Sequence, residues 1–109
     1  MIVLPWPPKE LSPNARVHWA VKARAAKQYR ALCAWEVVAS KVKAPKGKIR
    51  LRVEFLAPSR RRNDMDNCIA RMKAGFDGMA DAWGVNDAKF EIEPVMSDRL
   101  GGEVRVTVL

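Results

Sequence analysis

Hydrophobic and polar residues alternate in two stretches of the chain, and this alternation is the spacing of half-buried strands. Residues 49–56 alternate apolar with charged side chains, which predicts a strand with one face on the core and the other in solvent. Residues 89–93 alternate in the same way until Pro94, which favours an edge strand or a bulge. Residues 2–4 and 103–109 complete the set of predicted strands.

Two longer segments carry the three- and four-residue spacing of helices. Nothing breaks a helix between residues 16 and 43, where one apolar face is formed by Ala25, Ala26, Tyr29, Leu32, Cys33 and Val37. The second helix is expected from about residue 66 to residue 82, with one buried stripe formed by Ile69, Met72, Phe76, Met79 and Trp83. Because residues seven positions apart are close to whole turns of a helix, Asp66 and Lys73 are expected on the same side of it.

The order of these elements is β-α-β-α-β-β, without repeats, low-complexity tracts or an internal linker. We therefore expect an α+β fold: a single two-layer domain over residues 1–109, with a mixed or antiparallel sheet of about four strands backed by two helices. A chain of 109 residues suits one domain with a modest core. Residues 97–102 contain two glycines and are expected to form a hairpin-type connection between the last two strands.

The charge of the chain adds a class of partner to this picture. The net charge is +8, from 20 Lys and Arg against 12 Asp and Glu, and small basic proteins most often bind nucleic acid, anionic lipid or an acidic partner. No apolar run approaches the roughly 18–20 residues that span a bilayer. The N-terminus lacks the pattern of a signal peptide, so no membrane partner is expected. Cys33 and Cys68 are too few for a disulfide framework, which makes a reduced, cytoplasmic setting the default.

Candidate chemistry is concentrated in one short stretch, Arg60-Arg61-Arg62-Asn63-Asp64-Met65-Asp66-Asn67. Two carboxylates one residue apart share a side of an extended backbone, and they repel each other unless a cation lies between them. Their hard oxygen atoms suit Mg²⁺ or Mn²⁺, and the guanidinium fork of arginine fits phosphate. The stretch is interpreted as a metal site beside a phosphodiester clamp. The same residue types are also typical of turns and helix N-caps, so the motif alone leaves both interpretations open.

The first predicted helix is basic on one side, with Glu36 as its only acidic residue. Runs of charge are usually solvated surface, but this imbalance favours contact with phosphates. The residues expected to bind DNA are Arg16, Lys27, Arg30, Arg60, Arg61 and Arg62.

Taken in order, these motifs resemble the RusA family of phage and bacterial Holliday-junction resolvases. The resemblance covers essentially the whole chain and rests on Leu4-Pro5-Trp6-Pro7-Pro8, on the arginine–aspartate stretch, on Lys73-Ala74-Gly75-Phe76-Asp77-Gly78-Met79, and on Asn86-Asp87. It implies that Mg²⁺ is held by Asp64, Asp66 and Asp87, and that Lys73 acts in phosphodiester cleavage, about one turn later than in the founding members. Asn86 stands where the family often has a second aspartate.

The resemblance also implies a homodimer that resolves four-way DNA junctions by paired, symmetric nicks, in the cytoplasm of a bacterium or a phage-infected host. Two alternatives remain open. A non-catalytic basic DNA-binding module would explain the basic helix, but it has no need of three aspartates on a surface that meets phosphate. A metal nuclease acting on flaps or other branched DNA would need the same residues as a junction resolvase. The chain has no glycine-rich phosphate loop of the P-loop type, so nothing supports nucleotide hydrolysis.

Overall fold

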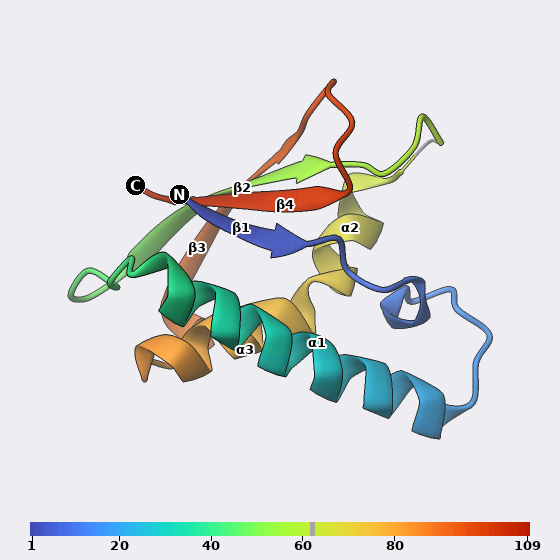
Figure 1. The fold of residues 1–109 in the computed structure, drawn as a ribbon, viewed down its shortest axis with the longest axis horizontal. Helices are drawn as coiled ribbons and strands as arrows, with labels where there is room; N and C mark the ends of the chain where they lie inside the picture. Colours follow the sequence, from blue (N-terminus) through green and yellow to red (C-terminus); the bar gives the residue numbers. More distant parts are fainter. Residues whose placement is uncertain (62) are drawn as a thin grey trace.

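Four strands form one mixed sheet in the order β1-β4-β2-β3 (Figure 1). The computed structural model describes residues 1–61 and 63–109. Its strands are β1 (Ile2–Pro5), β2 (Ile49–Leu56), β3 (Phe90–Met96) and β4 (Glu103–Val108). β4 pairs antiparallel with both β1 and β2, whereas β3 runs parallel to β2 at the edge of the sheet. The α+β fold with a four-stranded mixed sheet is as the hydrophobic pattern predicts.

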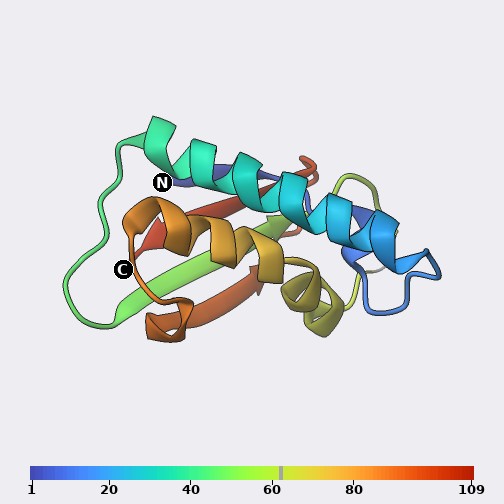
Figure 2. The same cartoon turned by 90° about the horizontal axis from the view of Figure 1, so that it is seen from below.

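Helices cover one face of this sheet (Figure 2). They are α1 (Trp19–Ser40), α2 (Met65–Arg71) and α3 (Lys73–Trp83), with short 3₁₀ turns η1 (Lys9–Leu11) and η2 (Asp87–Lys89). The side of β2 toward the helices carries Ile49, Leu51, Val53 and Phe55, all fully buried, while Arg50 and Arg52 are exposed on the other side. The predicted alternation is therefore confirmed. No helix within 1–61 or 63–109 is both long enough and apolar enough to cross a membrane.

The sequence-based expectation of a hairpin at residues 97–102 is wrong. β3 and β4 do not pair, because β2 lies between them in the sheet. The connection instead carries the chain across the end of β2, where the backbone amides of Gly101 and Gly102 donate to the Ala57 carbonyl oxygen. Pro94 lies within β3, and its position on an edge strand is the one expected for a residue that lacks an amide donor.

The first helix is shorter than its pattern predicts. α1 begins at Trp19, because His18 is the N-cap and its Nδ1 accepts from the Ala20 amide at 3.1 Å. The helix ends at Ser40, and Lys41 adopts a left-handed conformation with φ of 61°. Of the predicted apolar face, Tyr29, Cys33 and Val37 are buried, but Leu32 is 43% exposed. Arg16 therefore lies in the loop before the helix and not on its basic side.

The second predicted helix is divided in two. Met72 closes α2 and opens α3 with φ of −81° and ψ of −5°, and its side chain is fully buried, with Sδ 3.2 Å from the Tyr29 hydroxyl oxygen. No glycine or proline marks this break in the sequence. The expectation of one continuous helix from residue 66 to residue 82 is therefore wrong, since Asp66 and Lys73 belong to different helices.

The two long helices approach most closely at Gly78. A Cβ atom added to this residue would lie 2.2 Å from the backbone carbonyl oxygen of Arg30 in α1. This oxygen belongs to a helical backbone and cannot move without moving α1. The glycine is therefore required by the spacing of the two helices.

Replacing Gly78 with alanine is expected to destabilise the fold, at the upper end of the roughly 1–3 kcal/mol typical of overpacking. Urea unfolding followed by circular dichroism would measure this change in the free energy of unfolding. Gly84→Ala is a control, because nothing lies within 4 Å of its added Cβ and only its positive φ of 66° is strained. Equal stability of Gly78→Ala and the unmodified chain would contradict the close helix contact.

Candidate functional site

Asp64 and Asp66 begin α2, at the end of the loop that follows β2. Asp64 is the N-cap residue but makes no side-chain capping hydrogen bond, and both aspartates are exposed. Together with Asn67 they line a depression of about 520 Å³ against the loop at Pro13 and Asn14. The Asn67 side-chain amide donates to the Ser12 Oγ at 2.9 Å, which holds this loop against the helix.

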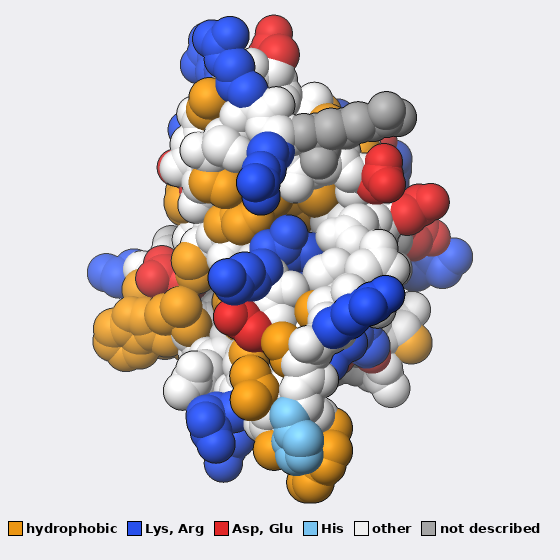
Figure 3. Space-filling model, turned by 90° about the vertical axis from the view of Figure 1, so that its right-hand side faces the viewer, with side chains coloured by type: hydrophobic (Ala, Val, Ile, Leu, Met, Phe, Trp, Pro, Cys, Tyr) orange, Lys and Arg blue, Asp and Glu red, His pale blue; other side chains and the backbone are white. Residues whose placement is uncertain are grey.

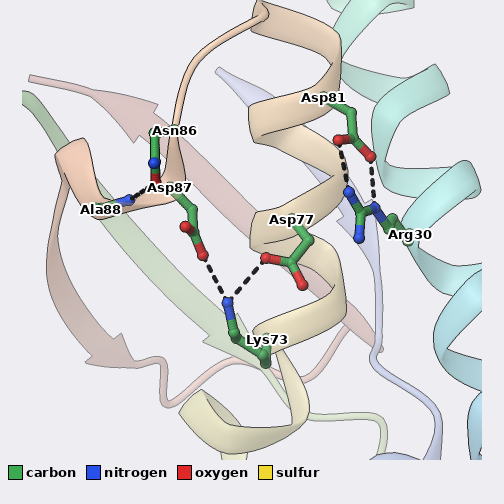
Figure 4. Close-up of polar contacts among 7 residues, drawn as sticks. All are labelled: Arg30, Lys73, Asp77, Asp81, Asn86, Asp87 and Ala88. Carbon is green, nitrogen blue, oxygen red and sulfur yellow. Dashed lines mark hydrogen bonds and ion pairs between the residues drawn. The ribbon is translucent and has the colours of Figure 1, made fainter.

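Lys73 is held between two carboxylates at the start of α3. Its ammonium nitrogen lies 2.9 Å from Oδ1 of Asp77, one turn along the helix, and 2.6 Å from Oδ2 of Asp87 in η2 (Figure 4). Asp87 is oriented by its neighbour, since the Asn86 Oδ1 accepts from the Ala88 amide at 2.9 Å and caps η2. We call Lys73, Asp77 and Asp87 the lysine cluster.

Electrostatics within the lysine cluster favour the charged forms of Lys73 and Asp87. The hydrogen bonds that the Lys73 ammonium donates, first to Asp87 and then to Asp77, raise the pKa of Lys73 above its usual value. The hydrogen bond from Lys73 lowers the pKa of Asp87 below its usual 3.8. Because Lys73 stays protonated, it is suited to act as a fixed positive charge or a proton donor and not as a base.

The lowered pKa of Asp87 gives a direct test of this cluster. Replacing Lys73 with methionine is expected to move the Asp87 titration midpoint up toward 3.8, as measured by carbon NMR of the carboxyl groups. A folded-state pKa below the unfolded value means that the ion pair stabilises the fold fully above about pH 4. The contribution is lost as the pH falls through the folded pKa. Lys89→Met is the control, and an Asp87 midpoint that is unmoved by Lys73→Met would contradict the contact.

The structure does not bring the three predicted metal ligands to one point. Asp87 contacts Lys73, whereas Asp64 and Asp66 line their own depression. In the described parts of the chain, no group of three His, Cys, Asp or Glu residues is placed to hold a metal ion. The carboxylate oxygens of the aspartates nevertheless suit Mg²⁺. This ion usually takes one or two carboxylates and completes its coordination shell with water and phosphate oxygens. Asp64 and Asp66, on one depression, fit that pattern, and the assignment of Asp87 as a third ligand stays a prediction.

The residues expected to bind DNA fall into two groups. Arg16, Lys27, Arg60 and Arg61 are exposed. Arg30 instead holds Asp81 through two hydrogen bonds of 2.6 and 2.8 Å, so its guanidinium fork is already occupied (Figure 4). Arg62 lies outside the described residues. Figure 3 shows Lys and Arg side chains spread over the face that contains α2, with the acidic side chains in small groups between them.

Sequence reasoning missed Asp77 and Asp81 as partners of basic residues. The spacing of four between Lys73 and Asp77 is a known signal of ion pairs on a helix and could have identified that contact. No local signal relates Arg30 to Asp81, because they lie 51 residues apart and meet only when α1 packs on α3.

Comparison with known proteins finds one informative relative. No family model matches the chain. A protein of Xylella fastidiosa strain Temecula1, which carries the name "Uncharacterized protein", is 42% identical to it over 115 aligned positions. The alignment covers 98% of this chain and 74% of the relative.

Proposed function

The chain belongs to the same family as the Xylella fastidiosa protein, and we propose that it is a Mg²⁺-dependent endodeoxyribonuclease of the RusA type, which resolves four-way DNA junctions in the cytoplasm. The observation that carries this proposal is the position of Lys73. Its ammonium group is fixed by two carboxylates directly after the helix that begins at Asp64 and Asp66. α2 has seven residues, a length of about 10 Å, so hard oxygen ligands and a fixed cation lie within reach of one stretch of DNA backbone.

Phosphodiester cleavage needs an activated water and neutralisation of the negative charge that develops at phosphorus and at the leaving oxygen. Mg²⁺ bound by Asp64 and Asp66 would supply the hydroxide and polarise the phosphate, whereas Asp87, the third predicted ligand, contacts Lys73 in this structure. Lys73 contributes a second positive charge that is already in place before the substrate binds, which favours the transition state over the ground state. Asp77 and Asp87 position this charge.

DNA binding by this basic chain is expected to weaken steeply with salt, because each phosphate neutralised adds about 0.9 to the slope of log affinity against log salt concentration. The variant Arg60→Ala should therefore lower the slope by up to about 0.9, as measured by fluorescence anisotropy of a labelled junction. Arg30→Ala is the matched comparison and should lower the salt slope less, because Asp81 already neutralises Arg30. An equal loss of slope in both proteins would show that the Asp81 contact yields to phosphate.

We further propose that the active form is a homodimer, since two opposed strands must be nicked. α1 leaves Leu32, Trp35 and Val38 more than 40% exposed, although the sheet covers its other side. This apolar surface is suited to bind a second copy of the chain. The large Trp35 has the small residues Ala31 and Ala39 one helical turn away on either side. Large and small side chains can therefore interdigitate across a two-fold axis. Sedimentation equilibrium should find a dimer that Leu32→Glu dissociates.

The reaction itself is tested with three substrates: a synthetic four-way junction, a flap and a linear duplex of the same sequence. The proposal predicts that in Mg²⁺ the junction is cut fastest. Faster cutting of the flap would assign the same residues to another branched substrate. Binding of all three without cutting would support a non-catalytic DNA-binding module.

A further inference from the structure

The first half of α1 and the residues around the α2–α3 break enclose a groove of about 410 Å³, which we call the alanine groove. α1 continues past this break (Figure 2). The helices touch at Gly78, and nearer the N-terminus of α1 four alanines lie on the surfaces that face the groove. Those surfaces are formed by Ala23, Ala26, Ala70 and Ala74. Because alanine cannot fill the space between two helices, the groove stays open with an apolar floor.

One wall of the alanine groove is Trp19, whose side chain is 76% exposed. Among residues 1–61 and 63–109, Trp19 does not belong to the side chains that pack against the core, and its ring lies beside that of His18, with ring centroids 5.4 Å apart and planes tilted by 34°. A tryptophan is normally well buried in a folded protein. Its large ring therefore offers a flat apolar surface at the mouth of an apolar groove.

Three cations line the same groove: Lys22, Arg71 and Lys73. Arg71 is fixed in place, because Nη2 donates to the Pro7 carbonyl oxygen at 2.5 Å and its Cζ lies 5.8 Å from the centre of the Trp6 ring. Lys22 has no ion-pair partner within residues 1–61 and 63–109. The one carboxylate of the lining, Asp77, already binds Lys73. The groove thus joins an aromatic wall and an apolar floor to an excess of positive charge.

We propose that the alanine groove binds one unpaired nucleotide of the DNA, with its base against Trp19 and its phosphate near Lys22 and Arg71. This inference rests on the proposed function, because Lys73 connects the groove to the lysine cluster. The volume is at the small end of the roughly 300–1,000 Å³ of ligand pockets, which suits one base better than a base pair. Unpairing a base costs least where the duplex is interrupted, as it is at a branch, so the groove would select branched over linear DNA.

The test is a binding titration in EDTA, in which no metal-dependent cleavage can occur. Fluorescence anisotropy of labelled hexathymidylate measures the affinity for unpaired DNA, and a labelled blunt-ended duplex of 12 base pairs measures the affinity for paired DNA. Trp19→Ala is expected to weaken hexathymidylate binding roughly 5- to 150-fold, the range found when one base loses an aromatic stacking partner. Duplex affinity should change less than about twofold, and Trp19→Phe should retain most of the hexathymidylate affinity.

Val95→Ala is the control, because Val95 is also an exposed apolar residue but lies on β3, and it belongs neither to the groove nor to the proposed dimer surface. It should bind hexathymidylate as the unmodified chain does. Unchanged binding by Trp19→Ala, or an equal loss in Val95→Ala, would overturn the proposal. Displacement of the hexathymidylate by hexaglutamate at equal concentration would also overturn it, since charge alone would then explain binding.

These outcomes distinguish failure of the groove proposal from failure of the proposed nuclease function. If Trp19→Ala loses hexathymidylate binding but no junction is cut in Mg²⁺, the groove stands and the nuclease assignment fails. If the junction is cut and Trp19→Ala binds hexathymidylate normally, the groove assignment alone fails.

Discussion

Junction cleavage is expected to fall by at least about 100-fold when Asp66 is replaced with asparagine, while junction binding persists or tightens. Loss of a group that merely supports a metal ligand typically costs 10- to 100-fold, so loss of a ligand itself should cost more. The same change removes a negative charge from a surface that meets phosphate, which relieves repulsion. Single-turnover cleavage in Mg²⁺ and anisotropy in EDTA measure the two effects separately.

Asp98→Asn is the matched control for this experiment. Asp98 is also exposed and carries the same charge, but it lies in the connection between β3 and β4, next to Arg60 and Arg61, and it does not line the depression of Asp64 and Asp66. It should cleave at the rate of the unmodified chain. If Asp66→Asn does so as well, Asp66 is not a metal ligand and the carboxylates at the start of α2 serve the helix N-terminus instead.

Replacing Lys73 with alanine should lower the cleavage rate by roughly 10²–10³, the scale found when one preorganised stabilising group is lost. The ammonium is held by Asp77 and Asp87 and needs no reorganisation when charge develops. Junction affinity should change little, because an exposed cation that is already paired adds little to binding. Rapid-quench kinetics at saturating protein would isolate the rate, with Lys89→Ala as the control. Cleavage by Lys73→Ala at the unmodified rate would remove Lys73 from the reaction.

The fold was largely predictable, because the spacing of apolar residues along the chain indicates which face of each strand and helix is buried. β2 is the clearest case, with every second residue from Ile49 to Phe55 fully buried. The order of strands was not predictable from the turn at residues 97–102, since local turn residues do not say which strand lies between two others. The parallel pairing of β2 and β3 needs a long crossover, and the helices at residues 65–83 are that crossover.

The candidate site was predictable in its residue types but not in its geometry. At the break, Met72 packs against Tyr29, a contact between residues 43 positions apart that no local pattern encodes. The break places Asp66 and Lys73 in different helices. Lys73 forms ion pairs with Asp77 and Asp87. The groove beside Trp19 was missed for the same reason, because it exists only where α1 faces α2 and α3.

Cleavage of a four-way junction by the unmodified protein, with and without Mg²⁺, tests the central claim most directly. Each of the four strands is labelled in turn at its 5′ end, and the products are separated on a denaturing gel. The proposed function predicts nicks at symmetric positions in two opposed strands in Mg²⁺, and intact strands in EDTA. Equal cleavage in EDTA, or no cleavage in Mg²⁺ under conditions where the junction is fully bound, would contradict it.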